Sequence, residues 1–189
     1  MNNELLERLN QQGCTIVGFA DLQLLPDDMR KGIKKLTTGI VLGATYSAGD
    51  TSQLLKQFSD CAVNFLVEKG YKAKTENKHP KILGTLSGIG WIGRSAMLTT
   101  SQTGPALRLT CVFTDAPFEH GTPITQSQCP QNCTSCADAC PANAIKGGLW
   151  ERGVHRDDFF DVGLCMSSRG KCNAACIKAC PFAKKGDAQ

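Results

Sequence analysis

The sequence has no long hydrophobic run, no secretion signal and no large excess of charge. None of its apolar stretches approaches the roughly 20 residues that a membrane-spanning helix needs, so we expect no membrane association. Residues 1–4 are polar, whereas a signal peptide begins with basic and then apolar residues. The formal net charge of +4 neither requires nor excludes an acidic or nucleic-acid partner. Together these features predict a cytoplasmic protein.

Low-complexity tracts are also lacking, and the composition is that of a folded chain. Hydrophobic residues make up 41% and charged residues 20% of the sequence, which excludes the disordered class of low hydrophobicity and high charge. A length of 189 residues suits one compact domain, or one domain with a small second lobe.

Cysteine, by contrast, is abundant. The chain has 11 cysteines, and eight of them lie within residues 129–180. In the reducing compartment that we expect, thiols serve metals or catalysis more often than disulfides. The remaining three cysteines, Cys14, Cys61 and Cys111, are expected to pack as small hydrophobic residues.

Composition divides the chain into two regions. Residues 1–115 show α/β patterning, and an apolar stripe followed by a glycine predicts a helix over residues 53–69. Residues 116–189 are rich in cysteine and in turn residues, and their first part, 116–128, has the composition of a connector. We therefore expect an α+β protein, with an α/β lobe at 1–115 and a cysteine-rich domain at 116–189.

Two further local predictions concern the first region. Residues 26–35 have acidic residues near the start and lysines near the end, which predicts a helix. Residues 96–100 and 106–114 have the pattern of strands on either side of Gly104 and Pro105, which predicts a β-hairpin.

The eight clustered cysteines have a characteristic spacing. They are Cys129, Cys133, Cys136, Cys140, Cys165, Cys172, Cys176 and Cys180. Bacterial ferredoxins carry the run C-x2-C-x2-C-x3-C-P, in which the fourth cysteine binds the other cluster. Both runs of this sequence end in Cys-x3-Cys-Pro. Each run has one interval that is a residue longer than the usual Cys-x2-Cys. These intervals are Cys129-x3-Cys133 and Cys172-x3-Cys176.

Eight cysteines, at four for each cluster, predict two [4Fe–4S] clusters. Three thiolates of one loop can reach three irons, so the fourth iron needs a thiolate from a distant segment. The crossed pattern assigns Cys129, Cys133, Cys136 and Cys180 to one cluster. It assigns Cys140, Cys165, Cys172 and Cys176 to the other.

Two other uses of these cysteines stay open at this point. Structural zinc sites also take four thiolates, although the Cys-x3-Cys-Pro endings favour clusters. A disulfide framework would need an oxidising compartment. A [4Fe–4S] core with four thiolates carries a charge of about −2, so two clusters would offset the +4 of the sequence. For this reason we expect no nucleic-acid partner.

A glycine-rich segment at residues 86–98 resembles a family motif. It contains Gly88, Gly90, Trp91, Gly93 and Arg94. The segment is similar to the G-x-G-W-x-G-[KR]-x-x-x-L stretch of epoxyqueuosine reductases and of their relatives, the corrinoid reductive dehalogenases. The resemblance continues through both cysteine runs and covers most of the chain.

The resemblance implies a fold and a cofactor. Family members combine a nitroreductase-like α/β region, which binds base-off cobalamin, with a ferredoxin-like region of two [4Fe–4S] clusters. By this resemblance, the five residues of the motif lie near the corrinoid. Glycines permit close backbone approach to a large ligand, and Arg94 could bind a phosphate or an amide. The alternative is a tight structural turn with Trp91 in the core.

The sequence departs from the family in two places. Epoxyqueuosine reductases carry an acidic residue in a D-x-A-P stretch just before the motif. The corresponding stretch of this chain is residues 77–80, in which Asn77 takes the place of the acidic residue. An amide cannot donate a proton as a carboxylic acid does. The family's Gly-Arg-Asp-Tyr segment is also missing, and residues 47–52 take its place. We therefore interpret the chain as a shortened paralogue.

The leading hypothesis is a redox protein that passes low-potential electrons to a corrinoid or to another bound acceptor, in an anaerobic cell. Its expected partners are a protein electron donor such as ferredoxin or flavodoxin, and a corrinoid or corrinoid protein. Whether the chain has a reductase activity of its own stays open. The alternative is a non-enzymatic, ferredoxin-like electron carrier or a subunit of a larger redox complex.

Overall fold

The computed structural model describes residues 1–46 and 50–183. Residues 47–49, half of the stretch that replaces the Gly-Arg-Asp-Tyr segment, lie outside this description. The chain divides into two compact units, residues 1–89 with 108–123 and residues 90–107 with 124–189. The roles predicted for residues 1–115 and 116–189 stay predictions.

The first unit is built on a four-stranded sheet in the order β1-β2-β6-β3. Its elements are α1 (Asn2–Gln11), β1 (Ile16–Asp21), the 3-10 turn η1 (Leu22–Leu24), β2 (Thr38–Thr45), α2 (Thr51–Glu68), β3 (Ala73–Thr75), α3 (Pro80–Leu86) and β6 (Leu107–Thr114). β1 pairs with β2 antiparallel, with Ile16 opposite Gly43, and β3 pairs with β6 antiparallel, with Ala73 opposite Thr114. Mixed helix and sheet is thus the observed class.

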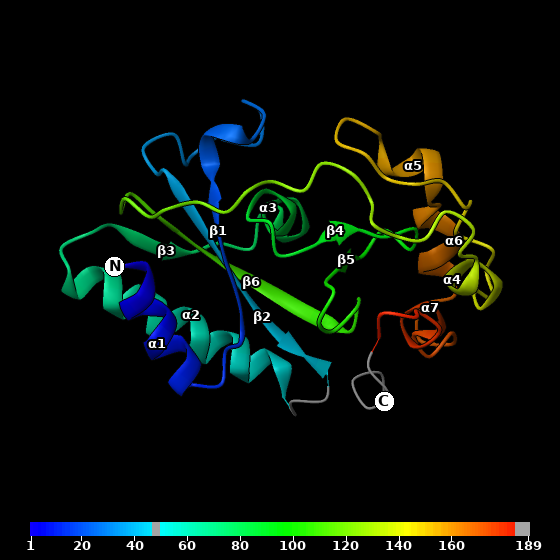
Figure 1. Cartoon of the computed structure of the whole chain (residues 1–189), viewed down its shortest axis with the longest axis horizontal. Helices are drawn as coiled ribbons and strands as arrows, with labels where there is room; N and C mark the ends of the chain where they lie inside the picture. The colour runs from blue at the N-terminus through cyan, green and yellow to red at the C-terminus, as the bar shows by residue number, and fades with distance from the viewer. Residues whose placement is uncertain (47–49, 184–189) are drawn as a thin grey trace. The chain divides into compact units, whose positions relative to one another are not determined.

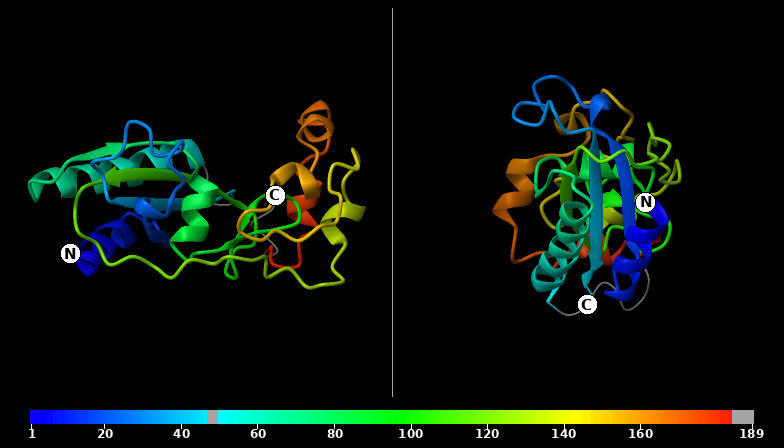
Figure 2. Two further views of the ribbon diagram at one scale, coloured as in Figure 1. Left: turned by 90° about the horizontal axis from the view of Figure 1, so that it is seen from above. Right: turned by 90° about the vertical axis from the view of Figure 1, so that its left-hand side faces the viewer.

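Alternate side chains of the strands fill two separate cores, because successive strand residues point to opposite faces. On β2, Ile40 and Leu42 pack with residues of α1 and α2, whereas Val41 packs with residues of α3. Figure 1 shows α1 beside α2 and α3 apart from both, and the right-hand view of Figure 2 again shows α1 and α2 side by side. β2 is buried along nearly its whole length, since both faces are covered.

The helix predicted over residues 53–69 is confirmed as α2. The Asp50 carboxylate caps it by accepting hydrogen bonds from the backbone N–H groups of Ser52 and Gln53, at 3.0 and 3.3 Å. Phe58 and Phe65 lie on its buried face. The helix ends before Gly70, whose positive φ of 83° suits a residue without a side chain.

Two local predictions are wrong. Residues 26–35 form consecutive turns instead of a helix, with the Met29 N–H bonded to the Pro26 carbonyl at 3.0 Å, and Gly32 at a φ of +81° takes the backbone out of the helical region. The predicted hairpin of residues 96–100 and 106–114 does not form either. β5 (Leu98–Thr99) pairs with β4 (Trp91–Ile92), whereas β6 joins the larger sheet.

The second unit has little regular structure. Beside β4 and β5 it contains four short helices: α4 (Ser135–Asp138), α5 (Arg156–Phe159), α6 (Val162–Ser167) and α7 (Ala175–Lys178). Its buried hydrophobic residues are few. Across residues 1–46 and 50–183, no helix is both long and apolar enough to cross a membrane.

Phe65 tests the packing of the first core. Its ring is fully buried on α2 beneath the Arg8 guanidinium, which lies 5.0 Å from the ring centroid. Phe65→Ala should lower the free energy of unfolding by about 3–5 kcal/mol, because it leaves a cavity. Anaerobic urea unfolding followed by far-ultraviolet circular dichroism measures this.

Val67→Ala on the same helix is the matched control, because Val67 is 58% exposed. It should change the free energy of unfolding by no more than about 0.5 kcal/mol. Equal effects of the two substitutions would contradict the described face of α2.

Candidate cysteine-lined metal centre

Four of the predicted cysteines line one small pocket of the second unit. They are Cys129, Cys133, Cys136 and Cys180. The rest of the lining comes from Gly93, Arg94, Ser95, Thr99, Pro130, Pro181 and Phe182. Cys180 thus joins three cysteines that lie more than 40 positions earlier in the chain. This is the grouping that the crossed ferredoxin pattern predicts for one cluster.

The other four predicted cysteines are also neighbours. Burial raises the pKa of the Cys176 thiol, and the nearby thiol groups of Cys140, Cys165 and Cys172 raise it further. Cys165 lies on α6, which is capped by the Asp161 carboxylate through the Leu164 N–H at 2.9 Å. The second grouping therefore also agrees with the crossed pattern.

The two groups adjoin one another. α4, which carries Cys136, contacts α7, which carries Cys176, and the Cys176 thiol contributes to the raised pKa of Cys136. Each helix is one turn long and is followed by a turn that places the Cys-Pro cysteine. The Cys140 N–H bonds to the Ala137 carbonyl at 3.0 Å, and the Cys180 N–H bonds to the Ile177 carbonyl at 3.2 Å. The repeated Cys-x3-Cys-Pro sequence thus has a repeated local fold.

Electrostatics in the pocket favour protonated thiols until a cation is bound. Burial raises the pKa of Cys136 to about 11, and the thiol groups of Cys129, Cys133 and Cys180 add to the shift. Burial also raises the pKa of Cys180, although the backbone N–H groups of Phe182 and Ala183 donate to its sulfur. Metal binding must therefore displace protons from these thiols.

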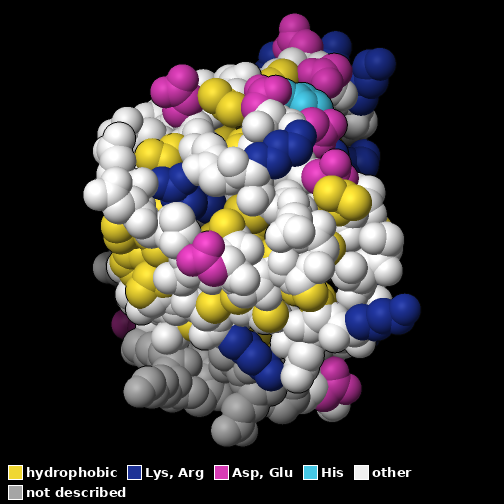
Figure 3. Space-filling view, turned by 90° about the vertical axis from the view of Figure 1, so that its right-hand side faces the viewer, with side chains coloured by type: hydrophobic (Ala, Val, Ile, Leu, Met, Phe, Trp, Pro, Cys, Tyr) yellow, Lys and Arg dark blue, Asp and Glu magenta, His cyan; other side chains and the backbone are white. Residues whose placement is uncertain are grey.

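The donor chemistry fits iron–sulfur clusters. The lining of the first pocket contains four thiols and neither histidine nor carboxylate, as [4Fe–4S] ligation requires. Within residues 1–46 and 50–183, no three His, Cys, Asp or Glu side chains form a site for a single metal ion. In the space-filling view of Figure 3, cationic, acidic and hydrophobic side chains are interspersed among the described residues.

The glycines of the family-like motif are explained by close contacts within the protein. A Cβ atom at Gly90 would lie 2.3 Å from the Thr99 carbonyl oxygen, and one at Gly93 would lie 2.8 Å from the Thr99 hydroxyl oxygen. Gly88 has a φ of +74°, and its Cβ would lie 2.5 Å from the Thr122 carbonyl oxygen. These contacts favour the alternative of a tight structural turn. A role beside a corrinoid stays a prediction.

Trp91 lies in the interior, as that alternative expects. Its side chain is 2% exposed and makes an edge-to-face contact with Phe182, with ring centroids 5.1 Å apart. Its indole Nε1 is buried without a hydrogen-bond partner. Phe182 and Thr99 were not identified from the sequence. The only signal for Phe182 was an aromatic residue directly after Cys180-Pro181, and Thr99 carried none.

Arg94 is bound to backbone carbonyl groups. Its guanidinium donates to the carbonyl oxygens of Gly147, of Gln131 at 2.5 Å and of Pro130 at 3.4 Å. The side chain is only 7% exposed. Since Pro130 and Gln131 lie between Cys129 and Cys133, Arg94 holds the loop that connects two cysteines of the first group.

The residues that replace the family's acidic stretch lie in the first unit. The Asn77 side-chain oxygen accepts a hydrogen bond from the Thr110 hydroxyl at 2.9 Å. His79 precedes α3 with a φ of 53°, and its side chain makes no capping hydrogen bond. Asn77 thus has a structural partner on β6, and an amide there supplies no acid.

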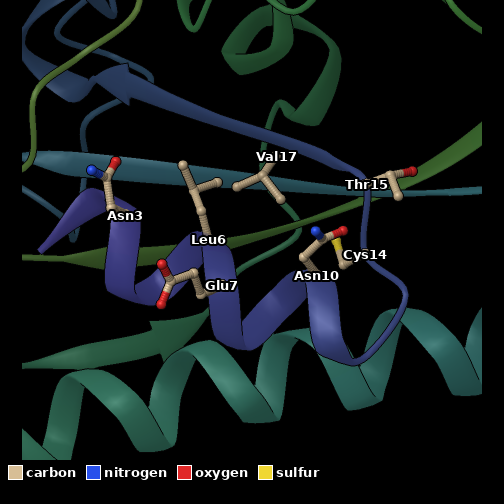
Figure 4. A pocket seen from close by; sticks show the side chains of 7 residues that line it. All are labelled: Asn3, Leu6, Glu7, Asn10, Cys14, Thr15 and Val17. Carbon is tan, nitrogen blue, oxygen red and sulfur yellow. The ribbon is translucent and has the colours of Figure 1, made fainter.

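A larger pocket of about 450 Å³ lies between α1 and the start of β1 (Figure 4). Its side chains are Asn3, Leu6, Glu7, Asn10, Cys14, Thr15 and Val17. Cys14 supplies the one thiol of this lining. It is 2% exposed and donates to the carbonyls of Ile16 and Gly43 at 3.7 and 3.9 Å. Burial raises its pKa to about 12, so the pocket offers no reactive thiolate.

The sequence matches no family model. It is 31% identical over 112 residues to the tetrachloroethene reductive dehalogenase of Sulfurospirillum multivorans, covering 52% of this chain and 22% of that protein. It is 29% identical over 102 residues to the epoxyqueuosine reductase of Bacillus subtilis, covering 51% of this chain and 26% of that protein. The chain thus spans about a quarter of the length of these curated relatives.

Solved structures extend the likeness to nearly the whole chain. The described fold matches an epoxyqueuosine reductase crystallised with a tRNA stem loop at a TM-score of 0.76 and 19% identity, over 98% of this chain and 66% of that chain. The chain resembles epoxyqueuosine reductases. It also matches the catabolic reductive dehalogenase NpRdhA at a TM-score of 0.65 and 15% identity, over 96% of this chain and 32% of that chain.

The predicted resemblance to epoxyqueuosine reductases and reductive dehalogenases is therefore confirmed. The expectation that this chain has no nucleic-acid partner is corrected in part. The structure with a tRNA stem loop indicates that nucleic acid is a ligand of a related protein, which argues against excluding nucleic acid from charge alone.

The three cysteines outside the two groups should differ in reactivity. Burial raises the pKa of Cys14 and of Cys111 to about 12 each, so at pH 8 roughly one molecule in ten thousand carries either thiolate. We expect iodoacetamide to leave both unmodified in the folded protein and to modify half-buried Cys61 faster. Peptide mass spectrometry measures the labelling.

In concentrated guanidinium all three thiols should react alike, which controls for differences between peptides. Fast labelling of Cys14 in the folded state would contradict its described burial.

Proposed function

We propose that this chain is a redox protein that holds two [4Fe–4S] clusters in a ferredoxin-like region and passes low-potential electrons to an acceptor. The observation that carries the proposal is the separation of eight cysteines into two adjoining groups of four. In sequence order each group takes three cysteines from one segment and one from the other. The Cys-x3-Cys-Pro endings of both runs favour clusters over a zinc or disulfide framework.

The first cluster would be held by the cysteines of the pocket, Cys129, Cys133, Cys136 and Cys180. The second would be held by Cys140, Cys165, Cys172 and Cys176. When bound, such clusters supply reversible one-electron transfer. Backbone N–H groups donate to the sulfurs of Cys180 and Cys176, and such hydrogen bonds favour the reduced state of a cluster.

The proposed acceptor is a corrinoid, bound by a nitroreductase-like first unit. Support comes from relatives, since a reductive dehalogenase structure of similar fold suggests a mechanism for B12-dependent dehalogenation. The motif residues Gly90, Trp91, Gly93 and Arg94 give no support of their own, because their contacts are made within the protein. A protein donor such as ferredoxin or flavodoxin would supply the electrons.

A second function has one observation in its favour. Asn77 stands where epoxyqueuosine reductases are expected to carry an acid, and its side chain is bonded to Thr110. A chain without this acid suits an electron carrier, or a subunit of a larger redox complex, better than a reductase of epoxyqueuosine. Cobalamin binding separates these two functions.

Pairs of cysteine substitutions test the clusters and their ligands. The wild-type chain, purified anaerobically, should contain about eight irons. Because Cys140 and Cys165 belong to one group, Cys140→Ala with Cys165→Ala should lose one cluster and keep about four irons. Cys165→Ala with Cys180→Ala takes one ligand from each group and should lose both clusters.

Consecutive grouping predicts the reverse result. If Cys140 joined the first three cysteines, Cys165→Ala with Cys180→Ala would remove one cluster. Cys140→Ala with Cys165→Ala would then remove both clusters. Cys61→Ala is the control, since Cys61 packs against the core of the first unit. Zinc in place of iron would overturn the proposal.

The acceptor is tested by adding hydroxocobalamin to the reduced protein without oxygen and recording visible spectra. A stoichiometric change to a base-off spectrum, followed by Co(I), is expected for a corrinoid-reducing protein. If the clusters reduce and reoxidise normally while the corrinoid spectrum stays unchanged, the electron-carrier function stands instead.

A further inference from the structure

Arg94 forms part of the wall of the first cysteine pocket. Its side chain reaches three backbone carbonyl oxygens from two separate segments, at Pro130 and Gln131 and at Gly147. The pocket that it lines also contains the thiols of Cys129, Cys133, Cys136 and Cys180. Arg94 therefore connects the family-like motif to the loop that carries two of these cysteines.

The charge of Arg94 has no carboxylate beside it. Among the ion pairs of the described residues, none includes Arg94, and its hydrogen-bond partners are neutral carbonyls. Its Nε is buried and has no hydrogen-bond partner. A buried charge is costly unless an opposite charge compensates it. The groups of this pocket that can become negative are its four thiols.

We propose that Arg94 positions the Cys129–Cys133 loop and is the counter-cation of the cluster held by Cys129, Cys133, Cys136 and Cys180. The inference rests on the proposed function, because it requires a cluster there. It differs from the role that the family resemblance implies, in which Arg94 binds a corrinoid.

The loop geometry explains why this cluster needs such a residue. Three residues separate Cys129 from Cys133, one more than in the usual ferredoxin run. The loop is a tight turn, in which the Cys133 N–H donates to the Pro130 carbonyl at 3.0 Å. Arg94 binds the Pro130 and Gln131 carbonyls, so the longer loop is held with its cysteines toward the pocket.

The electrostatic consequence can be measured. Reduction adds one electron, supplied by dithionite, to a cluster that is already negative, and a fixed cation beside it favours the reduced state. Removing the cation should lower the reduction potential of this cluster. The second cluster, held by the other four cysteines, should keep its potential.

The experiment is a spectroelectrochemical titration of the holoprotein, with electron paramagnetic resonance to follow each cluster. Arg94→Met removes the charge and keeps a long side chain. We expect its first cluster to become at least tenfold harder to reduce, which is about 59 mV for a one-electron couple. Cys140→Ala with Cys165→Ala supplies a background in which only the first cluster remains.

Two further variants separate charge from positioning. Arg94→Lys keeps the charge but lacks the planar group that reaches several carbonyls at once. Because the charge is kept, the equilibrium constant for reduction of the first cluster should change less than threefold. Amide hydrogen exchange of residues 131–133 should still become at least tenfold faster. Arg156→Met is the control, because Arg156 is an exposed arginine of the same unit, paired with Asp157. It should change neither quantity.

Several results would overturn the inference. If Arg94→Met holds its full iron content and the reduction potential of its first cluster is unchanged, Arg94 is not the counter-cation of that cluster. Unchanged amide exchange of residues 131–133 in both Arg94 variants excludes positioning. If Arg94→Met does not hold iron, Arg94→Lys and the exchange measurement decide. Wild-type protein without iron would be a failure of the proposed function, and the exchange measurement on that protein would still test the contact with the loop.

Discussion

Burial opposes the ionisation of the Cys136 and Cys180 thiols in the first cysteine pocket, and the cysteine chemistry of the second unit follows from this constraint. Burial and the neighbouring sulfurs together raise the pKa of Cys136 to about 11. Without a cation the Cys136 and Cys180 thiols therefore stay protonated. In the proposed holoprotein, a cationic iron–sulfur core would replace their protons and connect segments that have little apolar surface of their own to bury. Because the unit has short helices and few buried apolar residues, such a core would be its main source of stability.

The same constraint gives a reason for the crossed ligand pattern. α4 and α7 each carry one cysteine, Cys136 and Cys176, and the cysteine before proline lies beyond the end of each helix. Cys180 lines the pocket of the first run, and Cys140 lies near Cys176 of the second run. Each group of four thus ties two distant segments together. Because each segment contributes to both groups, the group that remains after loss of the other would still connect them.

The glycine-rich motif belongs to this arrangement. Gly90 and Gly93 let β4 lie against Thr99 of β5, and the Trp91 ring packs against Phe182, two residues after Cys180. Arg94 binds the carbonyls of the loop between Cys129 and Cys133. The motif therefore supports the walls of the first pocket from two sides. Its resemblance to epoxyqueuosine reductases and reductive dehalogenases is matched by a fold shared with both, although the chain spans only part of their lengths.

The sequence by itself determined the features that depend on local spacing. The apolar stripe and the glycine that follows it specified α2, because these signals act within a few residues of chain. The cysteine intervals predicted two groups of four only through the crossed ferredoxin pattern, since each group joins cysteines that lie far apart in the sequence. The turns of residues 26–35 were missed, since the charge pattern outweighed Gly32 in the prediction. The strand pairing was also missed, because β5 pairs with a strand before it and β6 with the larger sheet. Only the tertiary structure decided the partners of Arg94, Trp91 and Asn77, since those partners lie 33 to 91 positions away and no local pattern encodes such contacts.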